Sequence, residues 1–159
     1  MKKLILCSLI ILVITGTAFS EDWKFVAKTN YGDVYSISNV SLSATLAGLE
    51  GHGYTCWDHA FVDVKINLTK RNGRYSKKYG PSAKTVIESW HYYLHDDNPS
   101  SMIISRKVFN SNGKRINSDD DSLNVSGMYV DTSKGSAGRA VWQAIYKAKR
   151  AELKRGCKY

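Results

Sequence analysis

Residues 54–68 contain the pattern that most constrains the fold of this chain. Along the second half of this stretch every other side chain is apolar. Because successive side chains of a strand point to opposite faces of a sheet, this spacing predicts a long strand with one face in the core. The predicted core positions are Ala60, Val62, Val64, Ile66 and Leu68.

Similar but shorter patterns predict the other strands. Gly32 separates two alternating segments and predicts a hairpin turn, and the Asn112-Gly113 pair predicts a second one. We expect Trp23 and Phe25 to point inward, and Trp90, Tyr92 and Leu94 to share one face of their strand. The expected strands are residues 23–28, 34–40, 83–94, 101–109, 115–117 and 123–130.

Residues 136–155 show the one clear helical pattern, with apolar side chains three and four positions apart. Ser133 or Ser136 is the expected N-cap, and Gly156 suits a left-handed C-cap. The expected fold class is therefore α+β, an antiparallel sheet of about six strands with one C-terminal helix packed on it.

The beginning of the chain has the features of a secretory signal peptide. Lys2 and Lys3 precede an apolar run over residues 4–14, and Ala18 and Ser20 occupy small-residue positions. A retained anchor is the alternative, but the run is shorter than the roughly 20 residues that span a bilayer. We expect residues 1–20 to be cleaved, residues 21–159 to form a single domain without a transmembrane segment, and the protein to be periplasmic or on the cell surface.

Removal of the leader, which contains Cys7, leaves Cys56 and Cys157. In an oxidising compartment two remaining thiols most simply form a disulfide, and two unpaired buried thiols are the alternative. A disulfide between Cys56 and Cys157 closes a loop of about 100 residues and stabilises the fold by up to about 4.7 kcal/mol in the chain-entropy model.

The chain has 23 Lys and Arg against 14 Asp and Glu, a formal net charge of +9. Part of this excess is concentrated in residues 70–78, which we call the basic turn. Clustered cations with a neighbouring aromatic ring attract polyanions, although a solvated hairpin tip is the alternative interpretation. The candidate binding residues are Lys70, Arg71, Arg74, Tyr75, Lys77 and Lys78.

Catalytic and metal motifs are weak. In a strand, His91 and His95 lie about 13 Å apart, too far to chelate one ion, so we predict no metal site and no cofactor. The sequence has no nucleophile motif or glycine-rich phosphate loop, and no catalytic residue is predicted. The alternative function is an enzyme or enzyme inhibitor with a cleft near Trp57, His59, Trp90 and His91.

The order of these features resembles the bacterial surface-adhesin E family. The shared pieces are the leader, a Trp23 strand followed by residues 32–35, a strand ending at residues 105–109, a turn at residues 110–114, residues 134–136 before a helix, and a late cysteine. The chain departs from the family in two ways. Its final helix is longer, and its first cysteine is Cys56, whereas the family pattern would place that cysteine near His95.

The resemblance implies a six-stranded antiparallel sheet with a packed helix, and adhesion to host matrix proteins such as vitronectin or laminin. Together with the basic turn, it leads us to expect an exported, non-enzymatic binding module. Its expected partner is an extracellular protein or a polyanion, and the sequence leaves its oligomeric state open.

Overall fold

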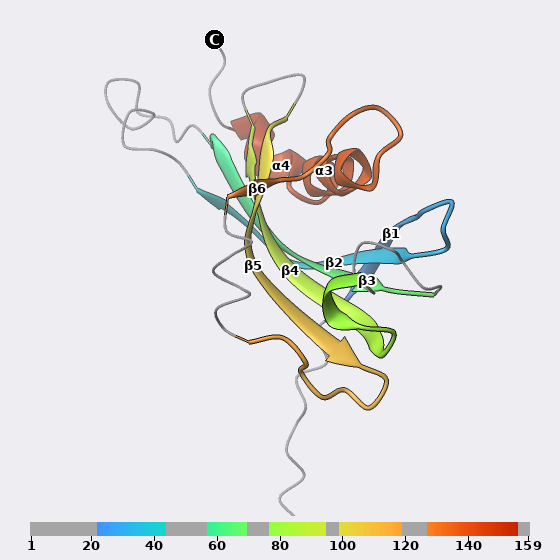
Figure 1. Ribbon diagram of the computed structural model, residues 1–159. Helices are drawn as coiled ribbons and strands as arrows, with labels where there is room; N and C mark the ends of the chain where they lie inside the picture. The colour runs from blue at the N-terminus through green and yellow to red at the C-terminus, as the bar shows by residue number, and fades with distance from the viewer. Residues whose placement is uncertain (1–21, 44–56, 70–76, 95–98, 119–126, 156–159) are drawn as a thin grey trace, which may run out of the picture.

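The computed structural model describes residues 22–43, 57–69, 77–94, 99–118 and 127–155 (Figure 1). Its central element is a six-stranded sheet in the order β1-β2-β3-β4-β5-β6, and every neighbouring pair is antiparallel. The strands are β1 Lys24–Lys28, β2 Val34–Ser43, β3 His59–Asn67, β4 Ala83–Tyr93, β5 Ser101–Asn110 and β6 Met128–Tyr129. The predicted α+β class, with about six antiparallel strands, is confirmed.

The core lies on one face of this sheet, and β3 and β4 form its centre. All five positions predicted for β3 and the residue after it are buried, and so are Trp90, Tyr92 and Leu94. The opposite face of the same strands alternates with this one and contains half-buried side chains such as Asp63 and Lys65. The period of two therefore identified the correct core face.

The β1–β2 hairpin turns at Gly32, which has a φ of +90°. The Thr29 N–H donates to the Asp33 carbonyl oxygen at 2.9 Å and closes this turn. The prediction that Phe25 points inward is wrong, because Phe25 is 67% exposed. A register shift between Phe25 and Ala27 places Val26 against the core instead.

Two of the predicted strands are much reduced. Residues 115–117 form a single bridge, between Phe109 and Arg115, instead of a strand. The strand predicted for residues 123–130 is present only as the two residues of β6, and residues 123–126 lie outside the described part. Both segments lie at the β5 side of the sheet.

The predicted C-terminal helix is present as two helices, α3 Ala137–Ala148 and α4 Arg150–Arg155. Ser136 is the N-cap, as predicted, and its Oγ accepts a hydrogen bond from the Arg139 N–H at 3.0 Å. The helix is interrupted at Lys149, whose φ of −107° and ψ of 14° are not helical. Beyond this break Leu153 still packs against the core.

Helix α3 packs on the core face at one end of the sheet (Figure 1). Its buried side chains Val141 and Ile145 face the sheet, and the Tyr92 hydroxyl donates to the Gly138 carbonyl oxygen at 2.9 Å. Among the described residues, no helix is both long and apolar enough to cross a membrane. The candidate site lies between the start of this helix and the core face of the sheet.

Candidate functional site

A cleft of about 840 Å³ lies between the core face of the sheet, the β1–β2 turn and the start of α3. One wall is formed by residues 27–31 and the other by residues 129–140 together with Gln143. Strand side chains line its floor, namely Tyr35, Ile66, Glu88, Trp90 and Ile103. The cleft thus joins segments that are more than 100 positions apart in the sequence.

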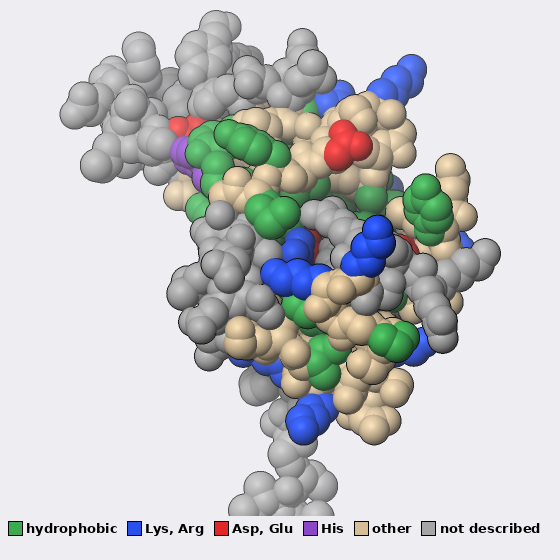
Figure 2. Space-filling model, in the orientation of Figure 1, with side chains coloured by type: hydrophobic (Ala, Val, Ile, Leu, Met, Phe, Trp, Pro, Cys, Tyr) green, Lys and Arg blue, Asp and Glu red, His purple; other side chains and the backbone are tan. Residues whose placement is uncertain are grey.

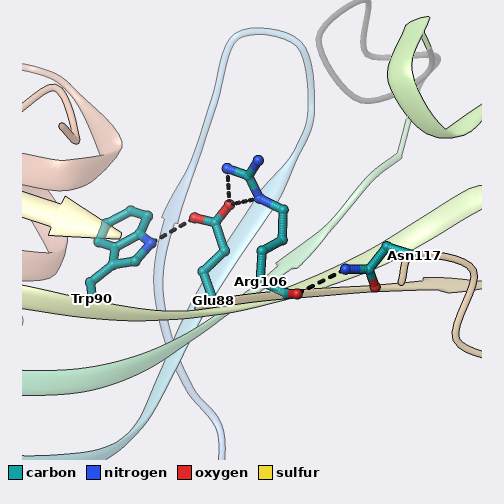
Figure 3. Close-up of polar contacts among 4 residues, drawn as sticks. All are labelled: Glu88, Trp90, Arg106 and Asn117. Atoms are coloured by element: carbon teal, nitrogen blue, oxygen red, sulfur yellow. Dashed lines mark hydrogen bonds and ion pairs between the residues drawn. The ribbon is translucent and has the colours of Figure 1, made fainter. Parts of the chain in front are cut away.

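A buried ion pair lies at this floor. Glu88 and Arg106 are only 1% and 4% exposed. Glu88 Oε1 accepts a hydrogen bond from Arg106 Nε at 2.5 Å and also lies 2.5 Å from Arg106 Nη2 (Figure 3). Glu88 Oε2 accepts from the Trp90 indole N–H at 2.6 Å. The carboxylate is therefore held on both oxygens, as a buried charge requires.

Asn117 fixes the backbone next to this ion pair. Its Nδ2 donates to the Arg106 carbonyl oxygen at 2.9 Å (Figure 3), and its Oδ1 accepts from the Val108 N–H at 2.7 Å. A single amide side chain thus forms the two hydrogen bonds that a neighbouring strand would otherwise provide. This explains why residues 115–117 follow β5 without forming the predicted return strand.

The rim of the cleft is predominantly cationic. Lys28, Lys134 and Arg139 line it, while Asp131 is the acidic residue among the described rim positions. The Asp131 carboxylate accepts a hydrogen bond from the Ser133 N–H at 2.9 Å, which lowers the pKa of Asp131. Figure 2 shows Lys and Arg side chains gathered around the middle of the face that it draws.

Aromatic rings accompany these cations. Tyr31 and Tyr129 line the cleft and are 74% and 78% exposed, and Trp90 lies at the floor. The Arg139 guanidinium lies 4.5 Å from the centre of the Trp142 ring, which orients it beside the cleft. Cations and flat aromatic faces at one concave surface are the groups that bind anionic or ring-containing ligands.

The basic turn is only partly described. Lys77 and Lys78 are exposed, and the Lys78 ammonium lies 5.2 Å from the centre of the Tyr79 ring, while Tyr79 packs against the core. The other predicted binding residues, Lys70, Arg71, Arg74 and Tyr75, lie outside the described residues, as do Cys56 and Cys157 and the leader. The disulfide and the leader cleavage stay predictions.

The opposite face of the sheet contains an aromatic cluster of His59, Phe61, His91 and Tyr93. His59 Nδ1 and His91 Nε2 lie 2.7 Å apart, and the Phe61 and His91 rings stack with centres 4.6 Å apart. Burial and the neighbouring His59 lower the pKa of His91, and Asp58 opposes this effect. The cluster is the largest group of titratable rings among the described residues.

The residues expected to line an enzyme cleft therefore do not lie together in the structure. Trp90 lines the cleft, but His91 follows it in β4 and points to the opposite face, where it contacts His59. Trp57 packs against the core. Sequence reasoning also missed Glu88 and Arg106, although Glu88 shares the core-facing parity of Trp90 and Tyr92 and was detectable as a carboxylate in a core position.

No protein-family model, curated protein or solved structure matched this chain.

Proposed function

We propose that the protein is an exported, non-enzymatic binding module that takes a polyanionic ligand at the cleft. The supporting observation is the cationic rim of Lys28, Lys134 and Arg139 around an aromatic-lined concavity of about 840 Å³. Export rests on the leader at residues 1–20. The likeness to adhesin E adds a surface location and a role in attachment to the same proposal.

The charge at the floor does not oppose an anion. Arg106 offsets the Glu88 charge, so the acidic side chain nearest the sheet adds no net negative charge. Asp131 stays ionised, since the Ser133 N–H lowers the pKa of its carboxyl. It is one anion beside the three rim cations Lys28, Lys134 and Arg139. The field at the rim is therefore set mainly by its cations, and oppositely charged ligands are drawn toward such a surface.

Two polar groups of the cleft, Ser136 and Glu88, make structural contacts. The Ser136 hydroxyl caps α3 and donates to the Asp131 carbonyl oxygen at 2.8 Å. The Glu88 carboxylate is held by Arg106 and Trp90. A nucleophile needs a base within hydrogen-bonding reach, and these two groups are engaged in other contacts. This arrangement favours binding over catalysis.

Binding of this kind depends on several weak contacts together. Exposed charge pairs contribute little individually and are screened by salt, so affinity for a polyanion is expected to fall steeply as ionic strength rises. The exposed Lys77 and Lys78 add cations outside the cleft lining. Exposed Tyr31 and Tyr129 add flat contact area at the mouth of the cleft.

Heparin, used as a model polyanion, tests the cleft directly. The Lys28→Gln/Lys134→Gln variant is compared on a heparin column with Lys107→Gln/Lys114→Gln, which removes the same charge from exposed positions outside the cleft. The cleft variant is expected to elute at clearly lower salt than the control. Equal shifts would show that retention reflects net charge alone and would overturn the assignment to the cleft.

A second variant tests the basic turn. Replacement of its five cations, Lys70, Arg71, Arg74, Lys77 and Lys78, by Gln is expected to lower the eluting salt further. Unchanged retention would remove the turn from the binding surface and leave the cleft as the site. Binding to vitronectin or laminin in the same buffer, without any heparin retention, would instead favour the adhesion implied by the adhesin E family.

A further inference from the structure

Two histidines, His59 and His91, lie close together on the face of the sheet opposite the cleft. His59 stands at the first position of β3, and His91 lies two positions before the Cα partner of His59 in β4. The two side chains are thus diagonal neighbours on one face. His59 Nδ1 and His91 Nε2 point toward each other at 2.7 Å.

Neighbouring groups hold both imidazoles in place. The Phe61 ring stacks on His91 with an angle of 7° between the ring planes, and Tyr93 packs edge-on against His59 with centres 5.1 Å apart. The Asp58 Oδ1 lies 3.6 Å from His59 Nε2. A carboxylate beside one imidazole nitrogen favours the proton on that nitrogen, which leaves the lone pair of the other nitrogen for a ligand.

We propose that His59 Nδ1 and His91 Nε2 bind one divalent copper ion. Imidazole is a preferred ligand of late first-row metals, and among divalent ions of that row copper binds nitrogen ligands most tightly. Within the described ranges no three or more His, Cys, Asp and Glu side chains gather around a metal position. The protein therefore supplies two ligands, and water or an external ligand fills the remaining positions.

The spacing of the two nitrogens favours copper over zinc. Two nitrogens at about 2.0 Å from a metal lie about 2.8 Å apart at the right angle of a tetragonal site, and about 3.3 Å apart in a tetrahedral one. The 2.7 Å between the two nitrogens is a hydrogen-bond distance, so either ion requires one ring to turn outward. The tetragonal geometry needs the smaller movement, and copper is also the divalent ion of this row that nitrogen ligands bind most tightly.

When both imidazoles are neutral, binding of the metal releases no proton from the site. The proton that one ring donates to the other in the metal-free pair moves to the opposite nitrogen of its own ring. Both facing lone pairs then bind the metal, and the charge of the ion is added to the site. The inference is independent of the proposed polyanion binding, because the cleft lies on the other face of the sheet.

The experiment uses the secreted full-length product after removal of metals with a chelator and titration with copper sulfate. We expect one copper ion per chain, and an electron paramagnetic resonance spectrum with splitting from two imidazole nitrogens. His59→Gln and His91→Gln are each expected to weaken copper binding at least tenfold. Zinc sulfate is expected to bind at least tenfold more weakly than copper sulfate.

The other two histidines of the chain, His52 and His95, lie outside the described residues, so the matched control is Asp63→Asn. Asp63 lies on the same face of β3, four positions beyond His59, and its replacement should leave the copper affinity and the spectrum unchanged. Circular dichroism verifies that each variant is folded, and the nitrogen splitting of the unsubstituted protein gives a readout that needs no variant. Wild-type affinity in His59→Gln and His91→Gln, equal loss of binding in Asp63→Asn, or a spectrum without two nitrogens would overturn the proposal.

Discussion

Glu88 and Arg106 are direct cross-strand partners in β4 and β5, and their side chains meet on the buried face of the sheet. Glu88 and Trp90 both line the cleft, and the Trp90 indole N–H donates to Glu88 Oε2 at 2.6 Å. A buried ion pair of this kind adds little net stability relative to apolar residues, but loss of one partner leaves an uncompensated charge.

We therefore expect Glu88→Gln to lower the free energy of unfolding by about 3–5 kcal/mol, because the Arg106 guanidinium loses its buried counter-charge. Urea unfolding followed by circular dichroism measures this change. Glu152→Gln is the matched control: Glu152 accepts from the exposed Lys149 ammonium at 2.9 Å, and its loss is expected to cost no more than about 1 kcal/mol. Equal effects of the two substitutions would contradict the structural role given to the buried pair.

The same ion pair permits a rescue. Glu88→Leu/Arg106→Met removes both charges and fills a similar volume with apolar atoms, so it is expected to restore most of the stability lost in Glu88→Gln. The measurement is again the free energy of unfolding in urea. A double variant less stable than Glu88→Gln would show that the two side chains contribute through contacts other than their charges.

Gly138 is required by close packing between α3 and the segment before it. A Cβ at this position would overlap the Asp131 carbonyl oxygen and lie 2.8 Å from the Val130 side chain. Gly138→Ala is expected to lower the free energy of unfolding by about 1–3 kcal/mol through overpacking, although alanine favours helices by about 1 kcal/mol. Thermal unfolding measures the effect, and Gln143→Ala, exposed in the same helix, should be within about 0.5 kcal/mol of wild type.

The buried Tyr92 is expected to make the folded protein less stable at alkaline pH. Burial raises the pKa of Tyr92 well above the usual tyrosine value of about 10, so the folded protein keeps the proton that the unfolded chain loses. The Tyr92 contribution is therefore fully present below pH 10 and declines above it, by about 1.4 kcal/mol per pH unit.

The comparison of wild type with Tyr92→Phe isolates this contribution. Phenylalanine loses the hydrogen bond to the Gly138 carbonyl oxygen, so it is expected to be less stable by about 1–2 kcal/mol at pH 7. In urea unfolding between pH 7 and 10.8 the difference should shrink above pH 10. A difference that stays constant over this range would mean that Tyr92 ionises equally in both states.

Cleavage of the leader and formation of the disulfide predict a specific mass for the secreted product. Intact mass spectrometry of the secreted product is expected to show a chain beginning at Glu21, lighter than the reduced chain by two hydrogen atoms because of a bond between Cys56 and Cys157. Ala18, as the alternative cleavage residue, would leave two more residues. Alkylation of both cysteines without reductant would exclude the disulfide. An uncleaved product would exclude the function of residues 1–20 as a cleaved leader.

The sequence was most informative where one periodicity ran without interruption. The apolar positions of β3 were all correct, because a period of two over nine residues leaves one choice of buried face. Ser136 was identified as a possible cap because a serine immediately precedes the helical pattern. These local features account for the fold class.

The sequence was less informative where contacts join distant segments. The approach of His59 and His91 depends on the register of β3 against β4, which no pattern in either strand specifies. The Asn117 side chain replaces strand hydrogen bonds beside β5, and this also depends on a contact between separate segments. The cleft needs the β1–β2 turn and α3 to meet, so its cations Lys28, Lys134 and Arg139 were not among the predicted binding residues.

The order of the strands has a consequence for how the chain folds. Every strand pairs only with its neighbours along the chain, so the sheet can assemble by successive hairpins without pairing of strands far apart in sequence. Helix α3, in contrast, contacts β1 across most of the sequence. We expect the nucleus to form within β3–β5 and docking of the helix to be the last and slowest step, so that a chain shortened before Ala137 would present an uncovered apolar sheet and aggregate.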